Sequence, residues 1–119
     1  MTQPTSIAGQ SAFVRPLTTA EEQSRQIALV KTPHVKVIQL LVPAGRDVPT
    51  HQAQGELIVH CLEGRVSLFA LGNTYDLTPG QLLHLSIDEP FSFRGIDNAS
   101  VLLTLIAEKA GGRIELIGG

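Results

Sequence analysis

Short runs of apolar and β-branched side chains, separated by turn-forming residues, fill this sequence from Ile27 onward. Helical periodicity is nearly absent from the same region, and the runs recur at spacings of about 8–12 residues. The pair Gly72-Asn73 between two runs is typical of a two-residue hairpin turn. This pattern predicts an all-β fold, an antiparallel sandwich or barrel. The runs cover residues 27–31, 35–42, 57–62, 65–71, 74–77, 81–85, 91–95, 99–107 and, as an edge strand, 113–117.

The N-terminal part of the chain has a different composition. Residues 19–26 contain helix formers, with Thr19 as the expected N-cap and Glu21 and Glu22 in the first turn. We therefore expect one short helical turn there. Residues 1–20 are expected to form a tail or an arm that docks on a partner subunit, and residues 21–119 to form a single domain.

Composition and charge exclude several classes of function. The net charge is −2 and no run of Lys or Arg occurs, which argues against a nucleic-acid partner. No apolar run approaches the roughly 20 residues that a membrane span requires. The single cysteine, Cys61, and an N-terminus without a secretory signal favour a cytoplasmic location.

Several of the predicted strands are apolar on both faces. Leu102 and Leu103 are one example, and Leu40 and Leu41 are another. One face of such a strand covers the barrel interior, so the other face needs a cover of its own. In a small all-β chain we expect that cover to be a second subunit, and we predict a homodimer.

Residues 45–64 contain glycine and histidine residues at spacings that match a known motif. Gly45 is followed by five residues and then by His51, and the segment ends at Gly64. A second set begins at Gly72 and continues at Pro79-Gly80. In order and spacing, the two sets resemble the two motifs of the cupin superfamily.

The resemblance covers about residues 35–107, most of the predicted strands. It implies a small jelly-roll β-barrel of the RmlC-like type. It also implies four metal-ligand positions inside the barrel, at which the family typically carries three His and one Glu. In this chain those positions hold His51, Ala53, Leu57 and Phe91.

The three replacements, Ala53, Leu57 and Phe91, leave no donor atom for a metal. One imidazole does not hold a divalent ion against water, and an apolar interior makes the entry of an ion costlier. No metal or other cofactor is therefore predicted. We expect instead a mostly apolar pocket for a small molecule, with the lining residues His51, Gln39, Leu57, Val59, Phe91 and Phe93.

An alternative metal site would use His51, Glu56 and His60. It requires the strand over residues 57–62 to be shifted by one residue, which would turn Glu56 and His60 inward. Without that shift, His60 lies on the outer face of the sheet. His84 is likewise expected outside, and Cys61 is expected to be a buried, unreactive thiol.

Three functions agree with these observations. The leading interpretation is a small-molecule-binding or accessory cupin protein that lacks the family metal site. An enzyme is the first alternative. It would be either isomerase-like and metal-independent, with His51 as acid or base, or a metal-dependent oxygenase or isomerase that uses the rebuilt site. The second alternative is a regulatory or structural partner of another protein.

Overall fold

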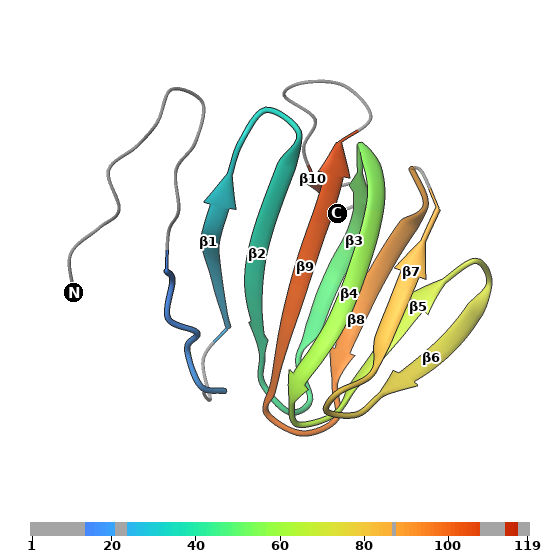
Figure 1. Cartoon of the computed structure of the whole chain (residues 1–119). Coiled ribbons are helices and arrows are strands. Elements are labelled where there is room, and N and C mark those ends of the chain that lie inside the picture. Colours follow the sequence, from blue (N-terminus) through green and yellow to red (C-terminus); the bar gives the residue numbers. More distant parts are fainter. Residues whose placement is uncertain (1–13, 21–23, 87, 108–113, 117–119) are drawn as a thin grey trace.

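The computed structural model describes residues 14–20, 24–86, 88–107 and 114–116. Within these residues the chain forms ten strands and no helix (Figure 1). The strands are β1 (Arg25–Lys31), β2 (Val35–Val42), β3 (Asp47–Ala53), β4 (Gly55–Glu63), β5 (Val66–Ala70), β6 (Asn73–Leu77), β7 (Leu82–Leu85), β8 (Pro90–Gly95), β9 (Ala99–Ala107) and β10 (Ile114–Leu116).

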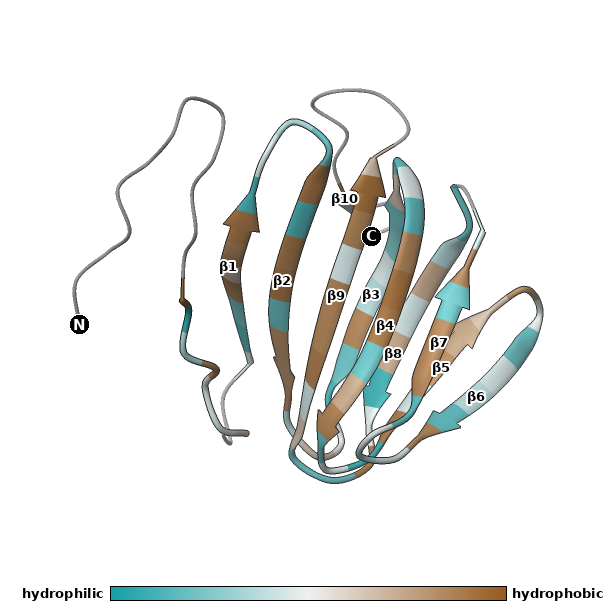
Figure 2. Ribbon diagram, viewed as in Figure 1, coloured by the Kyte–Doolittle hydropathy of each residue, from teal (hydrophilic) through white to brown (hydrophobic). Residues whose placement is uncertain are grey.

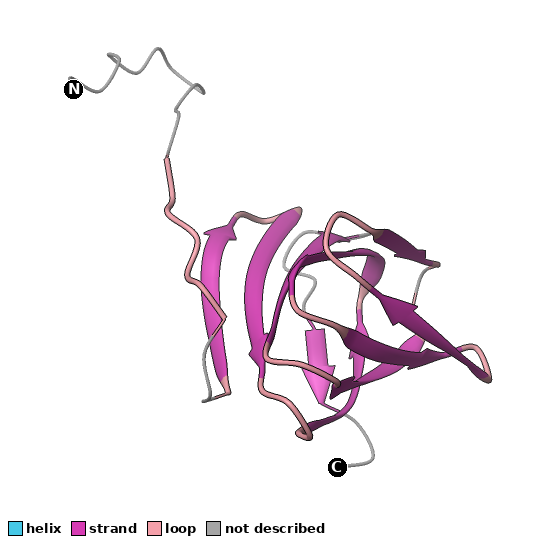
Figure 3. Cartoon of the chain, turned by 90° about the horizontal axis from the view of Figure 1, so that it is seen from below, coloured by secondary structure: helices cyan, strands magenta, loops and turns pink. Residues whose placement is uncertain are grey.

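The strands form two five-stranded antiparallel sheets that face each other. One sheet has the order β1-β2-β9-β4-β7 and the other the order β10-β3-β8-β5-β6. Seen from below, the strands enclose a barrel-like interior (Figure 3). The predicted all-β jelly roll is therefore confirmed.

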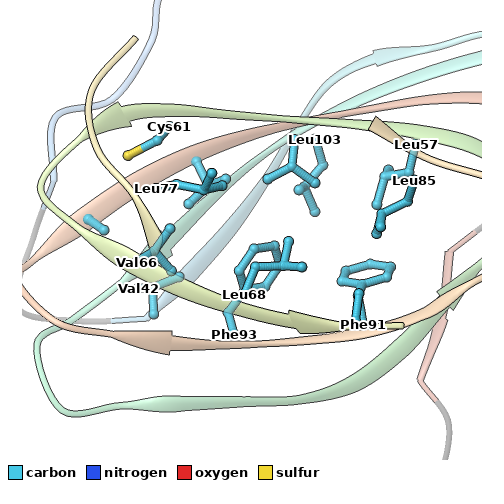
Figure 4. Close-up of a cluster of buried hydrophobic side chains, with 14 of the residues drawn as sticks. Val42, Leu57, Cys61, Val66, Leu68, Leu77, Leu85, Phe91, Phe93 and Leu103 are labelled. Atoms are coloured by element: carbon cyan, nitrogen blue, oxygen red, sulfur yellow. The ribbon is translucent and has the colours of Figure 1, made fainter. Parts of the chain in front are cut away.

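Side chains alternate between the two faces of each strand, and those that point inward form one continuous core between the sheets. On β4, Leu57, Val59 and Cys61 are buried, while the residues between them are exposed or half-buried. Side chains of both sheets meet in this core, as Figure 4 shows for Phe91 on one side and Leu85 on the other. The period of two along each strand places one side-chain set in the core and the other outside.

The turn after β4 explains why the first motif ends in glycine. Gly64 has a φ of +71°, in the left-handed region that favours glycine. A Cβ at this position would also collide with the backbone carbonyl oxygen of Asn98. Any side chain would therefore disturb the close approach of the β4–β5 turn to the start of β9.

The structure differs from the sequence predictions at two places. The helical turn predicted over residues 19–26 is not found among the described residues. Thr19 and Ala20 have no regular structure, and Arg25 and Gln26 belong to β1. Residues 21–23 lie outside the described residues. Strand β3 was not predicted, because its sequence DVPTHQA is polar and contains a proline. The pairing of β3 with β8 shifts between Val48 and His51, and such an irregularity accommodates Pro49.

Residues 18–20 lie on the outer side of the β1-β2-β9-β4-β7 sheet. The backbone N–H of Thr18 donates to Oε1 of Gln39 at 2.9 Å, and Nε2 of Gln39 donates to the Thr18 carbonyl and to Oγ of Ser100. The N–H of Ala20 donates to Oε1 of Glu63 at 3.1 Å. This short segment thus covers one end of the outer face. The described part of the chain contains no helix long and apolar enough to cross a membrane.

Candidate functional site

The four positions that match the cupin ligand positions lie on the inner faces of the sheets. His51 on β3 is the cross-strand partner of Phe91 on β8, and their ring centroids are 6.0 Å apart. Ala53, Leu57 and Phe91 are at most 2% exposed and belong to the same core cluster. Phe91 also packs edge-on against Phe93, with ring centroids 5.6 Å apart.

These residues do not fit a divalent metal ion. His51 supplies one nitrogen, whereas Ala53, Leu57 and Phe91 fill the interior with hydrocarbon. Among the described residues, no group of three or more His, Cys, Asp and Glu side chains lies close enough to hold a metal. An ion here would lose its water shell without gaining ligands to replace it.

The imidazole of His51 is oriented by the backbone. Its Nδ1 lies 2.6 Å from the carbonyl oxygen of Pro49. A carbonyl oxygen only accepts hydrogen bonds, so Nδ1 must carry the proton. In the neutral ring, Nε2 is then a hydrogen-bond acceptor held in a defined direction.

A small pocket lies beside His51 between the two sheets. Its volume is about 60 Å³, room for a molecule or group of a few heavy atoms. Its only polar side chains are His51 and Gln26. The lining residues are Gln26, Ile38, Leu40, Val48, His51, Phe91, Phe93, Leu103 and Ile114.

The predicted pocket residues are only partly brought together. His51, Phe91 and Phe93 line the pocket, while Leu57 and Val59 lie in the core without lining it. Gln39 does not face the interior. Its neighbours Ile38 and Leu40 point inward, so alternation turns Gln39 outward to Thr18 and Ser100.

Several lining residues were missed by the sequence analysis. Val48 lies on the unpredicted strand β3, and Ile114 lies on the edge strand β10, which pairs with β3. Ile38 and Leu40 flank Gln39 on β2. Side chains alternate between the two faces of a strand, so placing Ile38 and Leu40 on the inner face would have identified both as lining residues.

The alternative ligand set His51, Glu56 and His60 does not come together. Glu56 and His60 lie on the outer face of β4, because Leu57, Val59 and Cys61 occupy its inner face. Nε2 of His84 on the neighbouring strand β7 is 2.9 Å from Oε1 of Glu56. The Glu56 carboxylate therefore forms an exposed pair with His84, and this pair lies on the far side of the sheet from His51.

Cys61 is fully buried, as the sequence predicts. Burial raises the pKa of its thiol above the usual value of 9.0. At neutral pH the group is therefore a protonated thiol, and its environment is that of a packing residue rather than a nucleophile.

A larger and more open cleft lies on the outer face of the other sheet. Its volume is about 450 Å³, and its walls include hydroxyl groups, Phe69 and an ion pair. Nη1 of Arg94 lies 3.0 and 3.3 Å from the two carboxylate oxygens of Asp47, and Ser67 donates to Asp76 at 2.6 Å. The charged groups Asp47 and Arg94 of this cleft are thus paired with each other, and the Ser67 hydroxyl is paired with Asp76.

Comparison of the chain with solved structures finds cupins at low sequence identity. An RmlC-like cupin family protein from Methanocaldococcus jannaschii has 15% identity and a TM-score of 0.72, with 83% of this chain and 94% of that chain covered. A cupin superfamily protein from Desulfitobacterium hafniense has 17% identity and a TM-score of 0.70, with 77% and 84% covered. An RmlC-like cupin protein from Desulfovibrio desulfuricans has 21% identity and a TM-score of 0.66, with 82% and 95% covered.

No protein-family model matches the sequence, and no curated protein matches it. The likeness to solved structures is nevertheless consistent over most of the chain. The protein has the cupin fold, a double-stranded β-helix of the RmlC-like type.

Proposed function

We propose that this cupin-fold protein is a small-molecule-binding or accessory protein that works without a metal ion at the four motif positions. The observation that carries the proposal is that Ala53, Leu57 and Phe91 belong to the apolar core, with the ring of Phe91 stacked on the single imidazole of His51. Such a site offers hydrophobic contact and one hydrogen bond. It offers no cluster of donors at which an ion could activate oxygen or water.

The chemistry of the pocket limits the ligand. Nε2 of His51 accepts a hydrogen bond when the ring is neutral, and the remaining wall is apolar except for Gln26. The volume of about 60 Å³ admits a group of a few heavy atoms. A small compound with one donor, such as an alcohol or an amide, fits these constraints.

Two isomeric probes test the hydrogen bond. 1-Butanol and diethyl ether have nearly the same size, but only the alcohol donates. Titration followed by backbone NMR shifts should show the alcohol binding about three- to tenfold more tightly, the usual strength of one hydrogen bond. His51→Ala should remove the difference, and the control His60→Ala on the outer face should keep it.

Metal analysis provides the decisive counter-test. We expect purified protein to carry far less than one equivalent of Fe, Mn, Ni or Zn. Near-stoichiometric metal that is lost in the His51→Ala variant would contradict the proposal.

A second candidate function is metal-independent acid–base catalysis by His51. The contact with the Pro49 carbonyl favours it, because a general base needs a fixed tautomer with one nitrogen free to take a proton. On a substrate that the protein turns over, His51→Ala should lower kcat/KM at least about a hundredfold. An equal rate in the His51→Ala and wild-type proteins would remove this candidate.

A further inference from the structure

The open cleft on the outer face of the β10-β3-β8-β5-β6 sheet, which we call the outer cleft, lies over two rows of side chains. In the first row, Arg94 on β8 is the cross-strand partner of Asp47 on β3 and of Ser67 on β5. Ser67 in turn pairs with Asp76 on β6. Side chains in this row also bond to each other, since Arg94 donates to Asp47 and Ser67 donates to Asp76. The strand register thus produces a polar row across four strands.

The second row places an exposed aromatic ring between two hydroxyl groups. Phe69 on β5 is paired with Ser92 on β8 and with Thr74 on β6, and all three residues line the outer cleft. The Phe69 side chain is 56% exposed. Figure 2 shows β6 mostly in the teal and pale colours of polar residues, so the ring lies beside polar neighbours. An open aromatic face and hydroxyl groups are therefore offered together.

A second hollow continues the outer cleft along the strands. Its volume is about 370 Å³, and it shares Thr50, Phe69 and Ser92 with the first hollow of about 450 Å³. Leu71 lines its far end and is 54% exposed. The φ of Leu71 is +56°, in the left-handed region that favours Gly or Asn at a hairpin turn. An elongated ligand centred on Phe69 could thus contact both hollows and Leu71.

We propose that the outer cleft binds a neutral oligosaccharide. The faces of a sugar ring carry C–H groups, which pack on the negatively charged face of an aromatic ring. The hydroxyl groups at its rim both donate and accept hydrogen bonds, so they require donors and acceptors around the aromatic ring. Here Arg94 donates, Asp47 accepts, and Ser92 can do both. Phe69 and its polar neighbours match both parts of such a ligand.

Charge favours a neutral ligand over a phosphate or a nucleic acid. Among the described residues that line the two hollows, Arg94 is the one cation, and its Nη1 lies 3.0 and 3.3 Å from the carboxylate oxygens of Asp47. Glu89 adds a negative charge beside the second hollow. An anion would therefore meet a neutralised cation and a carboxylate. The side chains of Asp47 and Arg94 are more than half exposed, so both remain accessible to hydroxyl groups.

The position of the outer cleft favours a sugar over an extended peptide. Strands β3, β8 and β5 lie under the cleft, and each of them is paired with a neighbouring strand on both sides. A peptide that extends a sheet binds through the unpaired backbone groups of an edge strand. The outer cleft instead offers side chains on the face of the sheet, which suits ring stacking and hydroxyl bonds.

Titration of the purified protein with cellotriose, laminaritriose and maltotriose tests the proposal. Backbone NMR should show saturable shifts with at least one of these sugars, centred on residues 67–71 and 92–94. Phe69→Ala and Phe69→Leu should each weaken binding about tenfold, because both remove the aromatic face, whereas Phe69→Tyr should retain it. Leu82→Ala, at an exposed position of the other sheet, is the matched control and should bind as the wild type. His51→Ala should also bind as the wild type, since His51 does not line the outer cleft.

A second variant keeps the test independent of the ring. Arg94→Gln should also weaken binding, while its far-UV circular dichroism stays that of the wild type. The absence of shifts with all three sugars at about 20 mM would overturn the proposal. Equal affinities of the wild type, Phe69→Ala and Arg94→Gln would do the same, as would shifts confined to the pocket beside His51. Shifts of residues 67–71 on concentrating the protein without sugar would assign the cleft to a second copy and overturn it too.

Discussion

The two sheets have similar inner faces and opposite outer faces. Each inner face is apolar and fills the same core. Outside, one sheet carries hydroxyl groups and the Asp47–Arg94 pair, whereas the other carries exposed apolar side chains such as Leu82 and Ile106. Because side chains alternate between the two faces of a strand, every strand has inward and outward side chains, but this alternation does not decide what the outward side chains contact. The two outer faces therefore differ in the side chains they present, although both sheets contribute to one core.

Phe69 and Phe91 show the same contrast within a single sheet. Phe91 on β8 faces the core and is 2% exposed, while Phe69 on the adjacent strand β5 faces out and is 56% exposed. The two side chains are chemically identical and lie only one residue apart in register, since Ala70 pairs with Phe91. The face of the sheet on which each ring lies therefore determines how much that ring contributes to stability.

Truncation of these two rings should produce the largest difference. Phe91→Ala removes a buried ring that contacts His51 and Phe93, and it should lower the free energy of unfolding by about 3–5 kcal/mol. Phe69→Ala should change it by less than about 0.5 kcal/mol. Urea denaturation measures both values, and equal losses would mean that the outer face of this sheet is also covered.

Gln39 and Ser67 compare hydrogen bonds on the two outer faces. Gln39→Ala leaves the buried hydroxyl of Ser100 and the backbone of Thr18 without their partner, and should destabilise the protein by about 1–3 kcal/mol. It should also abolish the protection of the Thr18 amide against hydrogen exchange. Ser67→Ala breaks an exposed bond to Asp76 and should have little effect. Unchanged Thr18 protection in Gln39→Ala would show that other contacts hold the segment.

The exposed Asp47–Arg94 pair should contribute little to stability. Its side chains are 70% and 58% exposed, so water and salt screen the attraction. Arg94→Gln should lower the free energy of unfolding by less than about 1 kcal/mol, and the difference should vanish in 1 M NaCl. A larger, salt-insensitive loss would show that this face is shielded from solvent.

The smallest effect on stability is expected from Cys61, on the inner face of β4. Because burial raises its pKa in the folded state, the unfolded chain releases the thiol proton first as the pH rises. The stabilising contribution is thus complete below pH 9.0 and declines above it. Urea unfolding between pH 8 and 10 should show this decline, and Cys61→Ala should show less of it. Reaction with a thiol reagent should be slow for Cys61 and fast for an exposed thiol introduced by Ser67→Cys.

Most of the fold could be predicted because its signals are local. Apolar and β-branched runs bounded by turn residues predict β4 and β9, and the spacing of Gly45, His51 and Gly64 indicates the jelly roll. Strand β3 escapes prediction because its polar residues and proline lack that pattern. It forms a strand because its backbone pairs with β8 and β10 on either side.

The candidate site was only partly predictable for a related reason. The motif positions correctly place His51 and Phe91 on the inner side. Gln39 was assigned to the wrong side, because one polar residue in an apolar run such as VIQLL is compatible with either face. The choice depends on which face of β2 meets the opposite sheet.

The sequence by itself determined that this chain forms an all-β fold in which three of the four motif positions are apolar, since side-chain type and strand pattern are properties of neighbouring residues. Only the tertiary structure decided that Gln39 holds the N-terminal segment outside, that Pro49 orients His51, and that one outer face is left apolar. Each of these depends on which strands pair and on the irregular β3–β8 register. Those pairings join residues distant in sequence, and no local pattern encodes their geometry.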